Sequence, residues 1–211
     1  MKQQVTIDII SDIICPWCYI GKSRLSRAIE EVQNEFNITT RLRPFQLYPK
    51  IPKGGLPKSS FPATKKPGLG SALKAAAAEE NLVMDYKNIH VIPNTLEAHR
   101  LMYLCEPNND LKNALGLALF ESYFEKAEDV EDPLVLARIA RDTGMSKDKI
   151  DQFLMSDHGQ LEVEAEIQEL KADGIAAVPS FIINEDILVM GVQPMEKWLR
   201  FFQRLRQKAL K

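Results

Sequence analysis

The residues best suited to chemistry are two cysteines separated by two positions, in the segment Cys15-Pro16-Trp17-Cys18. The segment lies between an apolar, strand-like stretch at residues 5–14 and a helical pattern that begins at Pro16. Free backbone N–H groups and the positive end of the helix dipole stabilise a thiolate at such a junction. Cys15 is therefore expected to be the exposed, attacking sulfur. Cys18, one turn later and more buried, is expected to be the resolving sulfur.

Three neighbours complete the predicted active-site loop. Pro16 suits the first helical turn because its missing N–H would be unpaired there anyway. Asp12, three residues before Cys15, either relays a proton from Cys18 or caps the turn, and the cap is the favoured interpretation. Trp17 and Tyr19 are candidates for an apolar lip beside the substrate, although Tyr19 fits the core equally well.

The cysteine pair has two other interpretations, half of a structural zinc site or a purely structural pair. Structural zinc usually needs four ligands, and Cys105, His90, His99 and His158 show no ligand-like spacing with one another. A purely structural pair is less expected still at a helix start. The third cysteine, Cys105, is expected to be an inert buried thiol, with a second redox role as the alternative hypothesis. No metal site is predicted.

The order of the predicted elements is β-α-β, a helical block, then β-β-α. A strand at 5–10, a helix from Pro16 and a strand at 38–47 open the chain, and 49–70 is expected to be a loop with no core face. The remaining predicted helices span 71–81, 95–104, 111–122, 133–143, 147–155 and 160–172, followed by strands at 180–184 and 187–190 and a helix from Pro194.

This order predicts an α/β thioredoxin-like fold with a large all-helical insertion between its two halves. We expect residues 1–48 and 174–211 to form the thioredoxin-like domain, 71–173 the helical domain and 49–70 the connection. Val178-Pro179 directly precedes an apolar strand, where such folds place a cis-proline. The expected role of Val178 and Pro179 is to bind substrate by leaving the Val178 backbone free to pair with an extended chain.

Several segments together resemble the DsbA-like oxidoreductases of FrnE type. They are SDIICPWCYIG at 11–21, Asn94-Thr95 with Ala98-His99-Arg100-Leu101, Leu119-Phe120 with Tyr123-Phe124, Gly174-Ile175 to Val178-Pro179, and Gly191-Val192-Gln193-Pro194. The resemblance implies a thioredoxin fold with a helical insertion and disulfide oxidoreductase or isomerase activity. It also makes Asn94 and His99 candidates for substrate binding. The chain departs from the usual FrnE pattern in a shortened segment after Pro49.

The same superfamily contains 2-hydroxychromene-2-carboxylate isomerases and kappa-class glutathione transferases. These enzymes resemble this chain in Asn94, the helical insertion and the Val-Pro loop. They typically have serine in place of the first cysteine and bind glutathione. This chain keeps both cysteines, which favours redox chemistry over a glutathione-dependent isomerase or transferase.

The leading hypothesis is thus a cytoplasmic thiol–disulfide oxidoreductase or isomerase acting on protein or small-molecule thiols and disulfides. No cofactor is expected to be required, with glutathione a candidate redox partner or ligand. With 27 basic and 29 acidic residues the formal net charge is −2, which gives no sign of a nucleic-acid partner. No apolar run approaches the length of a membrane helix. A chaperone-like peptide-binding module is the non-enzymatic alternative, and the oligomeric state stays open between monomer and homodimer.

Overall fold

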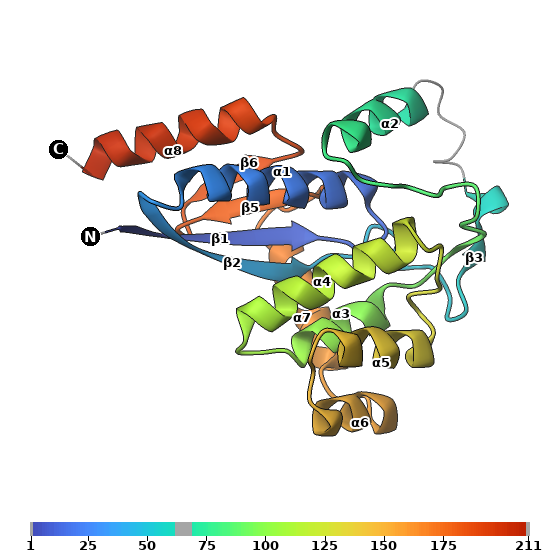
Figure 1. Ribbon diagram of the computed structural model, residues 1–211. Helices are drawn as coiled ribbons and strands as arrows, with labels where there is room; N and C mark the ends of the chain where they lie inside the picture. The colour runs from blue at the N-terminus through green and yellow to red at the C-terminus, as the bar shows by residue number, and fades with distance from the viewer. Residues whose placement is uncertain (1, 62–68, 210–211) are drawn as a thin grey trace.

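A computed structural model describes residues 2–61 and 69–209, built around a four-stranded sheet (Figure 1). The strand order is β2-β1-β5-β6. The central strand β1 runs parallel to β2 and antiparallel to β5, and β5 is antiparallel to β6. The bounds are Gln3–Ser11 for β1, Phe36–Pro44 for β2, Ser180–Ile183 for β5 and Ile187–Met190 for β6. This mixed sheet confirms the predicted thioredoxin-like arrangement.

Helices α1 (Pro16–Val32) and α8 (Met195–Ala209) cover one face of this sheet (Figure 1). Alternate residues of β1 meet them, because side chains of a strand point to opposite faces in turn. Val5, Ile7 and Ile9 therefore join the main core. Trp198 and Phe202 of α8 are buried in the same core, and Phe202 packs against Phe36 with 5.6 Å between ring centroids.

The helical block between the halves lies along the β2 edge and under the other face (Figure 1). Asn113 of α4 donates its amide N–H to the Thr40 carbonyl at 3.0 Å, so α4 covers the free edge of β2. On the opposite face, Leu170 of α7 joins Ile10 in a second core. The block consists of α3 Leu96–Tyr103, α4 Asn109–Phe124, α5 Pro133–Asp142, α6 Lys147–Met155 and α7 Gln160–Ala172.

The connection before this block is more structured than expected. Residues 49–70 were predicted as a loop with no core face, but Ile51 is buried and β3 (Leu56–Pro57) pairs antiparallel with β4 (Val91–Ile92). A 3₁₀ turn, η1, follows at Lys58–Ser60. A strand of two residues is too short to show an alternating pattern in the sequence. The prediction of a loop with no core face was therefore wrong. Residues 62–68 lie outside the described residues.

Helix α2 (Leu69–Glu79) packs beside α1 rather than with the helical block. Leu73, Ala76 and Ala77 form a small core with Ile20 of α1. The alanine-rich segment was correctly predicted as helical, although its position against the active-site helix was not foreseen. The division of the chain into two domains stays a prediction.

Local signals in the sequence set several helix ends. Asp132 caps α5 by accepting a hydrogen bond from the Leu134 N–H at 2.8 Å, with Pro133 at the first helical position. Gly144 follows the same helix with φ of +91°, a left-handed conformation that favours glycine. None of the helices in the described ranges is both long enough and apolar enough to span a bilayer.

Cys105 lies just beyond α3 and is fully buried. Its thiol lies 4.0 Å from the Leu101 carbonyl, to which it donates. Burial raises the pKa of Cys105 to about 11. The thiolate that any redox role needs is therefore scarce at neutral pH, which supports the expected inert thiol.

We predict that native Cys105 resists alkylation. At pH 8 only about one Cys105 side chain in a thousand is ionised, and burial blocks the reagent as well. Iodoacetamide at pH 8, followed by peptide mass spectrometry, should label Cys105 only after unfolding in urea. Labelling of Cys105 in the native protein at the rate of Cys15 would contradict this assignment.

We also predict that Phe202→Ala lowers the free energy of unfolding by about 3–5 kcal/mol, because it leaves a cavity between α8 and the sheet. The neighbouring Phe201 is only half-buried, so Phe201→Ala is a matched control with a distinctly smaller loss. Urea unfolding followed by circular dichroism measures both. Equal losses would show that α8 is not anchored through Phe202.

Candidate active site

Cys15 occupies the N-cap of α1, directly after the turn that leaves β1. Its backbone is extended, with φ −89° and ψ 109°, and its carbonyl accepts hydrogen bonds from Cys18 N–H at 3.0 Å and Tyr19 N–H at 3.3 Å. Pro16 fills the first helical position and needs no partner for an N–H. The first turn of the helix therefore begins at Cys15, as the sequence predicted.

Val178 and Pro179 lie against Cys15. The Val178–Pro179 peptide bond is cis, which confirms the sequence prediction. The Cys15 thiol donates to the Val178 carbonyl, with 3.9 Å between sulfur and oxygen. Residues 163 positions apart in the chain thus form one site.

Gly21 allows α1 to lie close to the proline. A Cβ atom at this position would be only 3.1 Å from Pro179 Cγ and 3.5 Å from the Phe181 ring. On the other side, Gly191 N–H donates to the Pro179 carbonyl at 2.8 Å. The proline is therefore held between the second turn of α1 and the end of β6.

Cys15 is less exposed than the sequence suggested. Only 4% of the Cys15 surface is accessible, against 0% for Cys18. Cys15 is therefore the less buried of the two, as predicted, but it is not exposed as expected. Cys15 is buried because it belongs to the main core and because the Val178 carbonyl lies 3.9 Å from its sulfur.

Tyr48 and Tyr86 lie close enough to Cys15 for its charge to act on them, and sequence reasoning missed both. Burial, and then the negative charge of Cys15 and Asp12, raises the pKa of Tyr48. Burial also raises the pKa of Tyr86, with further contributions from Tyr123 and Cys15. Tyr48 stacks edge-on against Phe61, with ring centroids 4.4 Å apart. The only sequence signal for Tyr48 was its place just after a strand that ends beside the cysteines.

Cys18 is a buried thiol whose ionisation is opposed by its surroundings. Burial raises the pKa of Cys18 well above its ordinary value, and the adjacent Cys15 raises it further. The backbone of Asp12 and the side chain of Ser11 act in the opposite direction. Cys18 therefore stays protonated in the resting dithiol, in which all three cysteines are free.

Ser11 is another residue that sequence reasoning missed. Its hydroxyl is buried and makes no hydrogen bond within the ranges described, and it acts to lower the pKa of Cys18. Ser11 ends β1, whose alternation places its side chain beneath the first turn of α1. A serine at a strand end is too common to signal this role.

Asp12 does not cap α1, so the favoured interpretation was wrong. The Cys15 side chain accepts no capping hydrogen bond, and of Asp12 only the backbone carbonyl serves the turn, accepting from Cys15 N–H at 3.0 Å. The carboxylate instead accepts from Leu47 N–H at 2.8 Å. Asp12 thereby fastens the segment that follows β2 to the active-site loop. No local sequence pattern indicates how close these two segments lie.

His99 and Asn94 lie behind the active-site loop. His99 Nε2 donates to the Phe45 carbonyl at 2.9 Å and lies 3.5 Å from Asp12 Oδ1, with both side chains fully buried. Asn94 is saturated with partners: its amide donates to the Ile51 carbonyl at 2.7 Å, and its oxygen accepts from Gln46 at 2.8 Å and Leu96 N–H at 3.0 Å. Direct substrate binding by either residue stays a prediction, and their observed contacts organise the loop at 45–51.

Tyr19 belongs to the core, whereas Trp17 is only partly buried. The Tyr19 ring stacks on Phe120 with 5.1 Å between centroids, and its hydroxyl donates to Glu125 at 2.8 Å. Trp17 packs between the main core and the α2 core. Of the two candidates for an apolar lip, Trp17 is therefore the one that remains.

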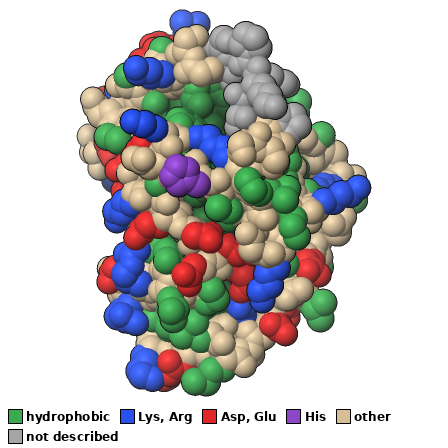
Figure 2. Space-filling model, turned by 90° about the vertical axis from the view of Figure 1, so that its right-hand side faces the viewer, with side chains coloured by type: hydrophobic (Ala, Val, Ile, Leu, Met, Phe, Trp, Pro, Cys, Tyr) green, Lys and Arg blue, Asp and Glu red, His purple; other side chains and the backbone are tan. Residues whose placement is uncertain are grey.

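The surface at this end of the molecule is chemically mixed. Figure 2 shows hydrophobic, acidic and basic side chains interspersed on the face where α2, β3 and α5 lie in Figure 1. Among the described residues, no three His, Cys, Asp or Glu side chains gather closely enough to hold a metal ion.

We predict that Ser11→Ala raises the pKa of Cys18 further, because the Ser11 hydroxyl acts to lower that pKa. NMR titration of ¹³Cβ-labelled cysteine measures the change. Thr6→Ala, on the opposite face of β1 and away from the cysteines, is the control. An unchanged Cys18 titration in Ser11→Ala would remove Ser11 from the site.

Comparison with solved structures supports the fold over nearly the whole chain. A probable DsbA oxidoreductase, SCO1869 from Streptomyces coelicolor, is 26% identical, with a TM-score of 0.82 over 95% of this chain and 89% of that one. A 2-hydroxychromene-2-carboxylate isomerase is 16% identical, with a TM-score of 0.74 over 97% and 98%. The cytosolic disulfide reductase DsbM from Pseudomonas aeruginosa, solved with GSH, is 15% identical, with a TM-score of 0.67 over 96% and 99%.

The last two similarities concern the fold alone. A family model, by contrast, matches residues 6–203, a span that runs from β1 into α8 and includes both cysteines and Pro179. With its sheet order, its Cys15–Val178 contact and this match, the chain belongs to the DsbA-like thioredoxin domain family.

Proposed function

We propose that this protein is a thiol–disulfide oxidoreductase or isomerase that works through Cys15 and Cys18 by way of a mixed disulfide. Membership of the DsbA-like family supports the general class. The observation that carries the proposal is the position of Cys15, at the N-terminus of α1 with its sulfur 3.9 Å from the Val178 carbonyl. This arrangement places a nucleophile beside a backbone segment that can pair with a substrate.

In the first step, the Cys15 thiolate attacks one sulfur of a substrate disulfide. A Cys15–substrate disulfide forms, the substrate S–S bond breaks, and the other substrate sulfur leaves as a thiolate. Cys15 stands at the N-terminus of α1, where the free N–H groups of the first turn favour a negative charge. Val178 would pair with the extended backbone next to the substrate cysteine, which holds the sulfurs in line.

In the second step, Cys18 loses its proton and attacks the Cys15 sulfur. The Cys15–Cys18 disulfide forms, and the second substrate sulfur leaves as a thiolate, so the substrate gains the two electrons that the dithiol loses. Ser11 and the Asp12 backbone offset part of the penalty of ionising buried Cys18. Run in reverse, the same steps oxidise a substrate dithiol, and release before the second step permits isomerisation.

Glutathione is a candidate partner for this chemistry. The similar fold of DsbM, solved with GSH, supports a glutathione-sized ligand near the cysteines, and that protein's cytosolic setting supports a cytoplasmic one here. We propose that no bound cofactor is needed, since the two sulfurs carry both electrons. Protein thiols and disulfides are the other proposed substrates.

We predict that Cys18→Ser traps a mixed disulfide, because Cys15 still attacks but cannot be resolved. Incubation with oxidised glutathione should add one glutathione to Cys15, as seen by intact mass and peptide mapping. Cys15→Ser should trap none. Cys105→Ser is the matched control and should react like the unaltered protein. Insulin reduction should fall at least about 100-fold in both active-site variants.

Two results would favour a different function for this protein. Glutathione-dependent isomerisation of 2-hydroxychromene-2-carboxylate that survives in Cys15→Ser and Cys18→Ser would favour the isomerase alternative. Suppression of aggregation that is unchanged when both cysteines are serine, without any disulfide exchange in the unaltered protein, would favour a peptide-binding module.

A further inference from the structure

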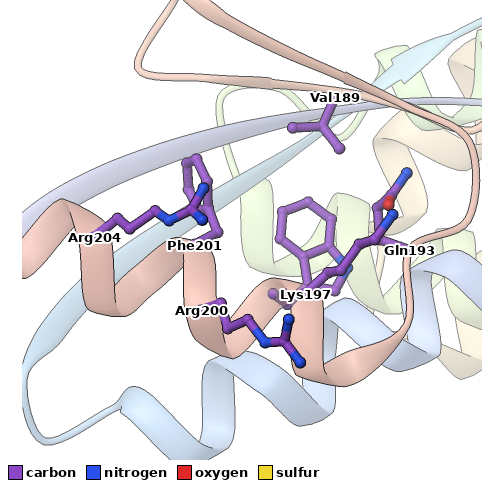
Figure 3. A pocket seen from close by; sticks show the side chains of 7 residues that line it. Val189, Gln193, Lys197, Arg200, Phe201 and Arg204 are labelled. Atoms are coloured by element: carbon purple, nitrogen blue, oxygen red, sulfur yellow. The ribbon is translucent and has the colours of Figure 1, made fainter.

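A hollow lies between the edge strand β6 and helix α8 (Figure 3). Its volume is about 310 Å³, at the lower end of the range for small-molecule sites. It is lined by Val189, Gln193, Lys197, Trp198, Arg200, Phe201 and Arg204. No cysteine takes part, so the hollow is separate from the candidate active site.

The rim of the hollow is cationic. Lys197, Arg200 and Arg204 lie at spacings of three and four residues, which places them on one flank of α8. Within residues 2–61 and 69–209 none of the three has a carboxylate partner, although Arg206 on the same helix pairs with Glu35 at 2.7 Å. Like charges at these spacings repel one another, and a bound anion would relieve that repulsion.

The floor of the hollow is apolar and contains one unused hydrogen-bond donor. Val189 and Phe201 are half-buried there, and Trp198 is only 1% exposed. The indole Nε1–H of Trp198 has no acceptor in the described part of the chain. A buried N–H group without a partner is costly, so this donor is an independent sign of a missing acceptor.

Gln193 adds a polar group at one end of the hollow, where Figure 3 shows it near Lys197. Its side-chain N–H groups donate to the Met190 carbonyl at 2.7 Å and the Gly191 carbonyl at 3.4 Å. These bonds fix the orientation of the amide. The residues around the hollow thus combine cations, a buried donor and an aromatic surface.

We propose that the hollow between β6 and α8 binds a small organic anion with an aromatic or aliphatic body. The carboxylate or phosphate group would lie among Lys197, Arg200 and Arg204. The apolar body would rest on Val189 and Phe201, and an oxygen of the ligand would accept from the Trp198 indole. This site is independent of the thiol chemistry proposed above.

The test uses phenyl phosphate as the probe, in isothermal titration calorimetry with the unaltered chain at low salt. We expect saturable binding, weaker binding in high salt, and no binding of phenol, which has the ring without the charge. Inorganic phosphate should bind less tightly than phenyl phosphate, because it lacks the apolar body.

Variants locate the site. Single Arg200→Gln and Arg204→Gln changes should weaken binding about threefold each, and the triple change that adds Lys197→Gln about tenfold or more. Arg206→Gln is the matched control, because Arg206 lies on α8 but does not line the hollow. In Trp17→Phe, Trp198 is the sole remaining tryptophan, and its fluorescence should change on binding.

Three results would overturn the proposal. They are the absence of saturable binding, equal affinity for phenol, and equal affinity in the triple variant. Because the readout is binding, a failure here is distinguishable from a failure of disulfide exchange at Cys15.

Discussion

The register between β1 and β5 is the constraint on which the site depends. Ile10 lies opposite Ser180, so the chain leaves β1 toward Cys15 beside the point where it enters β5 from Pro179. Antiparallel pairing with a two-residue repeat fixes this alignment, because a slip by one residue would turn every side chain of β5 to the wrong face. The contact between the Cys15 thiol and the Val178 carbonyl follows from that register.

The polar groups behind the cysteines form a second constraint. Asp12 and His99 are both fully buried, and a buried carboxylate is tolerated only when hydrogen bonds compensate for lost water. Asp12 obtains its bond from Leu47 N–H, His99 bonds to the Phe45 carbonyl, and Asn94 bonds to Gln46. Together they join the active-site turn, the segment after β2 and the start of α3. The helical insertion thereby positions the loop that carries Tyr48 beside the active site.

The two cysteines differ in their surroundings. Cys15 begins a helix and meets backbone from the second half of the fold, whereas Cys18 lies in the core, where burial raises its pKa. Such an asymmetry suits a pair in which one sulfur attacks and the other resolves.

Much of the fold was predictable because its signals are local. Several of these signals act through the neighbouring turn of backbone. They are the Cys15-Pro16-Trp17-Cys18 segment, Asp132 and Pro133 at the start of α5, and Gly144 after its end. The position of Pro179 before an apolar strand, combined with the β-α-β and β-β-α halves, was enough to predict the cis bond and its place opposite the cysteines. Trp198 and Phe202, four residues apart in α8, likewise share the face that is buried against the sheet.

The sequence by itself determined the candidate cysteine pair, the order of the elements and the family resemblance, because these depend on residue type and on spacings of a few positions. Only the tertiary structure decided the partners of Asp12, His99 and Asn94, the burial of Cys15 and Ser11, and the hollow beneath α8. Each of these arises where segments tens of residues apart pack together. The distance between such segments is set by the summed packing of the whole core, which no local pattern encodes.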